Sequence, residues 1–161
     1  MNTQPATPTA ATTDPVGVVR AVYAALERED ERTLHRLLAP DLEAFAPNAL
    51  PWGGYYTGAA GFADLLRRKL ETVDAGLEPS QWIAAGERVV VVARAKGCCR
   101  TTHRPLDLAL VHVWTVRAGR IASVECYADA SAVATARAAG DEAATVQSAA
   151  APAPSTTGAR T

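Results

Sequence analysis

Hydrophobic and polar residues alternate over residues 105–129, and this alternation predicts a long β-hairpin. The two alternating runs flank residues 117–120, where Gly119 supplies the left-handed backbone conformation that a tight turn with a bulge needs. Side chains two residues apart on a strand share one face. On the first strand that face carries Leu108, Leu110, His112, Trp114 and Val116. His112 is therefore a lone imidazole on an otherwise apolar strand face.

Apolar residues at helical spacing predict three helices upstream of this hairpin. Asp14 caps the first helix, which has Pro15 at its first position. The second helix is expected over residues 31–38 and the third over residues 59–73. We expect the apolar side of the third helix to carry Phe62, Leu65, Leu66, Leu70 and Val73. These helices leave apolar faces that need a sheet to cover them.

The remaining segments predict that sheet. A strand is expected at residues 42–46, followed by a loop over residues 47–58 that is rich in Pro and Gly. Four further strands are expected at residues 77–84, 88–101, 106–117 and 120–127, with a short helix near Ser131. Helices grouped before an antiparallel meander predict an α+β domain in which the sheet wraps the helices.

Composition limits the classes of function. The chain has 161 residues, 48% of them hydrophobic, which suits one domain, expected at residues 14–139. Residues 1–13 and 140–161 are rich in Ala, Pro, Ser and Thr, and we expect them to be disordered. A net charge of −1 gives no electrostatic footprint for nucleic acid or for a membrane surface. The start of the chain does not look like a signal peptide, and three cysteines form no disulfide framework, so a cytoplasmic location is expected.

Four segments give the chain a family resemblance. They are VVRAVYAALEREDERTLHRLLAPDLEAFAP, LPWGGYYTGAAGFADLL, IAAGERVVVVARAKG and HVWTVRAGRIASVECYADASAV. The sequence resembles the SnoaL-like polyketide cyclases and relatives of ketosteroid isomerase, which share the nuclear-transport-factor-2-like cone fold. The resemblance implies a curved, mixed but mainly antiparallel sheet wrapped around three helices. We also expect a homodimer formed through the outer face of the sheet. The fold hosts isomerases, cyclases, dehydratases, epoxide hydrolases and non-catalytic binders, so it does not decide the activity.

Several catalytic residues of these families have no counterpart at the matching positions of this chain. Ketosteroid isomerase uses an aspartate base, a tyrosine donor and a protonated aspartic acid. By resemblance these fall at Ala46, at Val22 beside Tyr23, and at His112. The SnoaL-like cyclases resemble the chain at His112, but the aspartate that they use as acid/base falls at Cys126. The catalytic residues of ketosteroid isomerase are thus absent, and half of the catalytic residues of the SnoaL-like cyclases are missing.

Two interpretations of His112 stay open. It is either a core histidine bonded to backbone or to a tyrosine hydroxyl, or the polar centre of a pocket. As a neutral imidazole it could accept a proton from a substrate enol or donate to a developing oxyanion. With a bulge in the hairpin, Cys126 faces His112, and without it Glu125 does. Cys126 is either a small buried residue or a nucleophile whose thiolate His112 would stabilise.

Small residues on the facing strands leave volume that bulky neighbours or a ligand must fill. The residues predicted to bind a ligand are Tyr23, Trp52, Tyr55, Tyr56, Phe62, Trp114 and Cys126. The loop over residues 51–56 reads either as a lid at the mouth of the cone or as a packed surface loop with Trp52 plugging the open end. The sequence leaves open whether Tyr23 points at the cavity or at the sheet.

The chain has no phosphate-binding glycine loop, no Ser-His-Asp order and no zinc spacing, so we predict chemistry without metal or cofactor. Cys98 and Cys99 are adjacent on a strand and point to opposite faces, which argues against a metal site with His103. The predicted function is a SnoaL-like enzyme that cyclises, isomerises or dehydrates an apolar or aromatic, polyketide-like molecule, with His112 as the acid/base.

Two other functions are weighed against this one. A non-catalytic small-molecule-binding or dimeric accessory protein of the same fold is favoured by Ala46 and Cys126 at the family's acid/base positions. An epoxide hydrolase would need an Asp-Arg-Asp arrangement, and the expected inner faces carry no such carboxylate pair.

Overall fold

The computed structural model describes residues 14–138, so the expectations for residues 1–13 and 139–161 lie outside the described residues. The helices are α1 (Pro15–Glu27), α2 (Glu31–Leu37) and α3 (Gly58–Thr72), and residues 130–138 are also helical. The strands are β1 (Leu38–Ala46), β2 (Gly54–Thr57), β3 (Val73–Ala85), β4 (Arg88–Cys99), β5 (Pro105–Arg117) and β6 (Arg120–Ala128).

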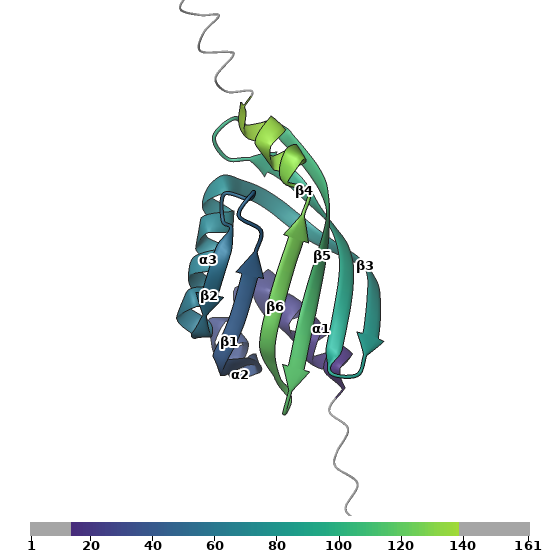
Figure 1. The fold of residues 1–161 in the computed structure, drawn as a ribbon. Coiled ribbons are helices and arrows are strands. Elements are labelled where there is room, and N and C mark those ends of the chain that lie inside the picture. Colours follow the sequence, from purple (N-terminus) through teal and green to yellow (C-terminus); the bar gives the residue numbers. More distant parts are fainter. Residues whose placement is uncertain (1–13, 139–161) are drawn as a thin grey trace, which may run out of the picture.

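The six strands form one mixed sheet in the order β2-β1-β6-β5-β4-β3. Neighbouring strands are antiparallel except β1 and β6, which run parallel. Figure 1 shows the sheet bending around α1, α2 and α3, which lie on one side of it. The predicted α+β fold with a curved sheet wrapped around the helices is confirmed.

The inner face of the sheet forms the core together with the helices. On β4 the buried residues alternate with exposed ones, as expected for a strand with one face on the core. The buried set is Val89, Val91, Ala93, Ala95 and Cys99. Arg94 and Lys96 point to the outer face and are exposed. From the helices, Val19 and Val22 of α1 and Phe62 of α3 are buried against this face.

Three boundaries differ from the sequence prediction. β1 begins at Leu38 rather than residue 42, and the loop predicted at residues 47–58 contains β2, which pairs with β1. β3 begins at Val73, immediately after α3. The strand contains Pro79, which is tolerated because β3 is an edge strand, and its register shifts just after this residue. Pairing with β4 over the whole length outweighs the local signal.

The β5–β6 hairpin sets the register of the site. Ala118 and Gly119 form a two-residue turn with φ of 48° and 73°, the backbone that matches the twist of the flanking strands. The register shifts between Thr115 and Val116, as a bulge requires. His112 therefore pairs with Cys126 rather than with Glu125, and the bulged alternative is the correct one.

Candidate small-molecule site

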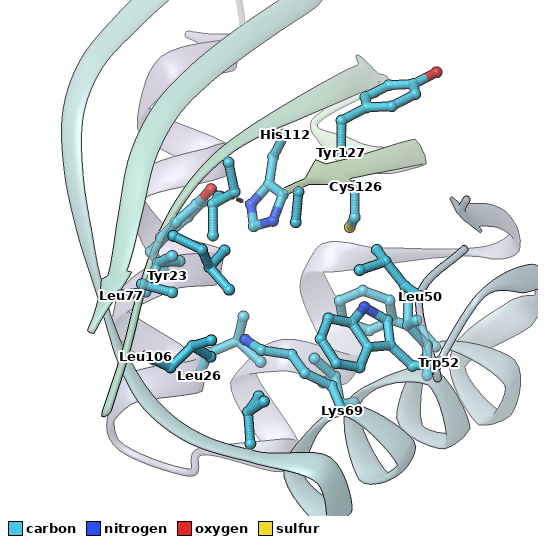
Figure 2. A pocket seen from close by; sticks show the side chains of 18 of the residues that line it. Tyr23, Leu26, Leu50, Trp52, Lys69, Leu77, Leu106, His112, Cys126 and Tyr127 are labelled. Carbon is cyan, nitrogen blue, oxygen red and sulfur yellow. Dashed lines mark hydrogen bonds between the residues drawn. The ribbon is translucent and has the colours of Figure 1, made fainter. Parts of the chain in front are cut away.

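A cavity lies between the inner face of the sheet, α1, α3 and the loop after β1 (Figure 2). Most of its lining is aliphatic or aromatic, with Leu106, Leu108 and Leu110 of β5 forming much of one wall. The cavity volume is about 80 Å³. That is several times the space one water needs. Among the described residues, no aspartate or glutamate lines it.

His112 and Tyr23 form a hydrogen-bonded pair at one side of this cavity. The distance between Tyr23 Oη and His112 Nδ1 is 2.6 Å. Burial, followed by the nearby charge of Lys69, lowers the pKa of His112 to about 3. Burial also raises the pKa of Tyr23 above its ordinary value. Both groups are therefore neutral at pH 7.

The tautomer of His112 follows from the chemistry of the two partners. A phenol is a better donor than a neutral imidazole N–H, and an unprotonated ring nitrogen is a good acceptor, so we assign Tyr23 Oη as the donor to Nδ1. Nε2 then carries the ring proton, and Figure 2 shows this side of the ring facing the cavity. The two sequence interpretations of His112 thus combine. One nitrogen is bonded to a tyrosine hydroxyl, and the ring also borders the pocket.

Aromatic packing fixes this pair in place. The ring centroids of His112 and Trp114 lie 6.0 Å apart at an interplanar angle of 89°. Tyr23 makes edge contacts with Trp114 at 5.9 Å and with Trp82 at 5.1 Å. Edge-to-face pairs of this kind restrict the orientation of each ring. The imidazole is therefore held in one orientation before any ligand binds.

Trp114 carries a buried polar group beside the Tyr23–His112 pair. Its side chain is buried, and its Nε1–H has no hydrogen-bond partner among the described residues. Leaving a buried donor unpaired costs about 1–3 kcal/mol. Burial raises the pKa of Tyr23, and this N–H lowers it to a smaller extent, because the indole nitrogen lies close to the phenol oxygen.

Lys69 is the functional candidate that the sequence analysis missed. α3 carries it into the cavity, where Figure 2 shows it across the open space from His112. Leu70, which we placed on the apolar side of the helix, is instead 52% exposed. The signal was present, because position 69 continues the buried spacing of Phe62 and Leu65. A lysine at a core position of an amphipathic helix marks a cavity rather than a packed core.

Cys126 faces His112 across the β5–β6 ladder and lines the cavity. Burial raises the pKa of its thiol to about 12, although the Lys69 charge opposes this. A thiol that stays protonated is a poor nucleophile. The arrangement favours the small buried residue over the stabilised thiolate.

The aromatic residues of the loop, β2 and the start of α3 divide into two groups. Trp52 and Phe62 are buried and line the cavity. Tyr56 is buried behind the loop, where its hydroxyl donates to the carbonyl of Trp52 at 2.7 Å. Tyr55 is 83% exposed and stacks on Phe45, with ring centroids 4.6 Å apart. Alternation along β2 sends these neighbouring tyrosines to opposite faces.

The structure thus brings together His112 and five of the seven residues predicted to bind a ligand. These five are Tyr23, Trp52, Phe62, Trp114 and Cys126, while Tyr55 and Tyr56 do not line the cavity. Within residues 14–138, no group of three or more His, Cys, Asp or Glu side chains could hold a metal ion. No helix in the described part of the chain has the length and apolar character needed to cross a bilayer.

A bent sheet that closes over helices and leaves an apolar cavity with a few polar groups defines a cone-shaped α+β protein of the NTF2-like class. The family model of the SnoaL-like domain matches residues 19–124, about two thirds of the chain. The chain belongs to the SnoaL-like family. None of the curated proteins matches the sequence.

Solved structures agree with this assignment. An NTF2-like protein from Burkholderia xenovorans LB400 is 34% identical, with 76% of this chain and 94% of that chain covered and a TM-score of 0.69. TerC, co-crystallised with polyporic acid, is 26% identical over 76% of this chain and 98% of its own, with a TM-score of 0.68. An LEH-like epoxide hydrolase from M. tuberculosis shares the fold at 23% identity, covering 86% of this chain and 99% of that chain, with a TM-score of 0.63.

Proposed function

We propose that this protein is a cofactor-independent enzyme that binds an apolar or aromatic carbonyl compound and promotes its cyclisation, isomerisation or dehydration. The observation that carries the proposal is the neutral Tyr23–His112 pair on the wall of an apolar cavity. A few placed polar groups in an otherwise apolar pocket are typical of a small-molecule site.

The geometry supports a role for His112 in stabilising negative charge on oxygen. Its Nε2–H is the donor that faces the cavity. Donors fixed in a site with little water stabilise an enolate or alkoxide far better than mobile donors in water. Aldol cyclisation, double-bond isomerisation and dehydration next to a carbonyl all develop such charge, so one site could serve any of them.

The proton that must be moved can come from the substrate itself. An enolisable substrate can pass the proton of its acidic C–H or O–H to a basic oxygen of the same molecule, which suits a cavity that no carboxylate base lines among the described residues. Holding reacting atoms of one molecule close together contributes several kcal/mol to the barrier reduction. TerC, a solved structure of the same fold, was co-crystallised with polyporic acid. These points support a site that works by positioning and oxyanion stabilisation.

A specific observation favours a second candidate, a non-catalytic binder. Ala46 is buried and cannot act as a base, and the Cys126 thiol stays protonated. A carrier or accessory protein would need the cavity but not the proton donor. The two candidates therefore differ in what His112 must do.

Comparing metabolites of the native strain with and without the gene, by mass spectrometry, tests the enzyme. We expect a precursor to accumulate in the deletion strain, and we expect wild type but not His112→Ala to remove it. Arg94→Ala, on the outer face of the sheet, is the matched control and should restore the profile. Circular dichroism must show that His112→Ala folds. Full restoration by His112→Ala, or an unchanged profile in the deletion strain, would leave the binder as the better account.

We also propose a cytoplasmic homodimer formed through the outer face of the sheet. Support comes from exposed aromatic residues there. Tyr55 is 83% exposed, Tyr127 is 41% exposed, and both pack against Phe45. Exposed aromatic clusters are typical of protein interfaces. Sedimentation equilibrium of wild type and Tyr55→Lys tests this, since a dimer at that face should weaken in the variant.

A further inference from the structure

The chain has only two lysines, and they lie in opposite environments. Lys96 is on the outer face of β4, half exposed, with its Nζ 2.8 Å from Glu78 Oε2. Lys69 is partly buried and lines the cavity, and no ion pair joins it to any described carboxylate. A cation enclosed by apolar side chains without a partner costs stability. An ammonium group of this kind in a cavity is stabilised when a bound ligand supplies the anionic partner.

Lys69 sits where two hollows meet. His112 lines the inner cavity. A wider hollow of about 550 Å³ opens between α1, α3 and β3. Both are lined by Tyr23, Leu26, Leu66, Lys69 and Leu77, so the two spaces adjoin at these side chains. A ligand larger than the inner cavity would have to extend past Lys69 into the wider hollow.

The titratable groups around Lys69 do not neutralise it. In the inner cavity, Tyr23, His112 and Cys126 are all uncharged at pH 7. In the wider hollow, α1 contributes Arg20 and the exposed Glu27. The Arg20 guanidinium lies 4.4 Å from the centre of the Trp82 ring, which adds positive charge to that wall. Burial lowers the pKa of Lys69, as expected for an ammonium group short of a counter-charge.

We propose that Lys69 Nζ binds an acidic oxygen of the ligand, so that the natural ligand is an apolar or aromatic carbonyl compound carrying a carboxylate or an ionised enol. Its carbonyl oxygen lies toward His112, and its acidic group lies across the cavity at Lys69. This inference rests on the proposed function, because it requires that the cavity binds a small molecule. It makes Lys69 a specificity-determining residue that selects anionic over neutral ligands of the same shape.

A pair of probes with the same ring and different charge tests the proposal. The dissociation constants of 2-naphthoate and 2-naphthamide are measured by titration calorimetry or tryptophan fluorescence at pH 7. We expect wild type to bind the carboxylate about tenfold or more tightly than the carboxamide. Lys69→Met should remove that preference by weakening only the carboxylate, and Lys69→Arg should keep it. Lys96→Met is the matched control and should bind both probes as wild type does.

A cavity-filling variant separates the failure of this proposal from the failure of the proposed function. Leu108→Trp should abolish binding of both probes if they occupy the cavity. Equal affinity of wild type for the two probes, or equal weakening of both by Lys69→Met, would overturn the role of Lys69 and leave the cavity intact. If neither probe binds, or if Leu108→Trp binds both normally, the small-molecule cavity itself fails and this inference falls with it.

Discussion

Charged side chains form ion pairs on the outer face of the sheet, whereas the polar groups on the inner side have few partners in the described structure. On the outer face, Arg94 pairs with Asp107 and Lys96 with Glu78, each at 2.8 Å and each about half exposed. On the inner side, Lys69 and the Trp114 N–H have no partner in the described structure, and His112 bonds only to Tyr23. Exposed pairs contribute little and cost little. Buried polar groups without ionic partners lower stability, and titratable groups of this kind in a cavity are candidates for a functional site.

The largest expected difference between the faces is the response of His112 to acid. Its pKa is about 3 in the folded protein, against 6.5 for an exposed histidine. Below pH 6.5 the histidine is protonated in the unfolded chain but stays neutral in the folded protein. The free energy of unfolding therefore falls as the pH drops from about 6.5 toward 3. The full effect has an upper limit of roughly 5 kcal/mol. Urea unfolding of wild type and His112→Phe at pH 7 and pH 4.5 measures it.

In that experiment, wild type should lose roughly 2–3 kcal/mol more than His112→Phe between the two pH values. The two proteins differ only at position 112, so the contributions of their other groups cancel in the comparison. Equal loss in the two proteins would mean that His112 is not held neutral, and the contrast between the faces would weaken.

Removal of the Tyr23 hydroxyl should give the next largest effect. Tyr23→Phe keeps the ring contacts with Trp82 and Trp114 but leaves His112 Nδ1 without its partner. We expect a loss of about 1–3 kcal/mol in the free energy of unfolding. The double variant Tyr23→Phe/His112→Phe should recover part of this loss, because both polar partners are then gone. Additive losses in the double variant would show that the hydrogen bond does not couple the two residues.

Replacing the cavity lysine should raise stability. Lys69→Met removes a partly buried, unpaired cation and keeps the length of the side chain, so we expect a gain of about 1 kcal/mol or more without ligand. Because its pKa is lowered in the folded state, wild type should also gain stability as the pH rises toward 10.5, the ordinary value for lysine, whereas Lys69→Met should not. Thermal unfolding across that range compares the two, with Lys96→Met as the control expected to unfold as wild type does.

The sequence predicted the parts of the site that depend on strand alternation. His112, Trp114 and the inner face of β4 follow from a period of two, and Gly119 with a bulge gave the correct pairing of His112 with Cys126. Resemblance to a known family implied a mixed sheet, but which strands pair in parallel, β1 with β6, is seen only in the structure.

The parts that could not be predicted depend on contacts between distant elements. The hydrogen bond between Tyr23 and His112 joins residues 89 positions apart. Which of Tyr55 and Tyr56 faces the core is seen only in the structure, because the pairing of β2 with β1 decides it. Lys69 was missed for a different reason. Its charge is typical of a residue in solvent, although its helical position lies in line with the buried Phe62 and Leu65.

The smallest expected effect lies on the outer face, and it tests whether the contrast holds there. Arg94 and Asp107 pair across β4 and β5 with side chains about half exposed. A double-mutant cycle with Arg94→Ala and Asp107→Ala should give a coupling energy below about 1 kcal/mol, reduced further by 0.5 M salt, because water and ions screen an exposed pair. Chemical denaturation of the four proteins measures it. A coupling as large as that of Tyr23 with His112 would mean that the outer face also stores energy in specific polar contacts. The case for the inner polar groups as a ligand site would then have to rest on ligand binding alone.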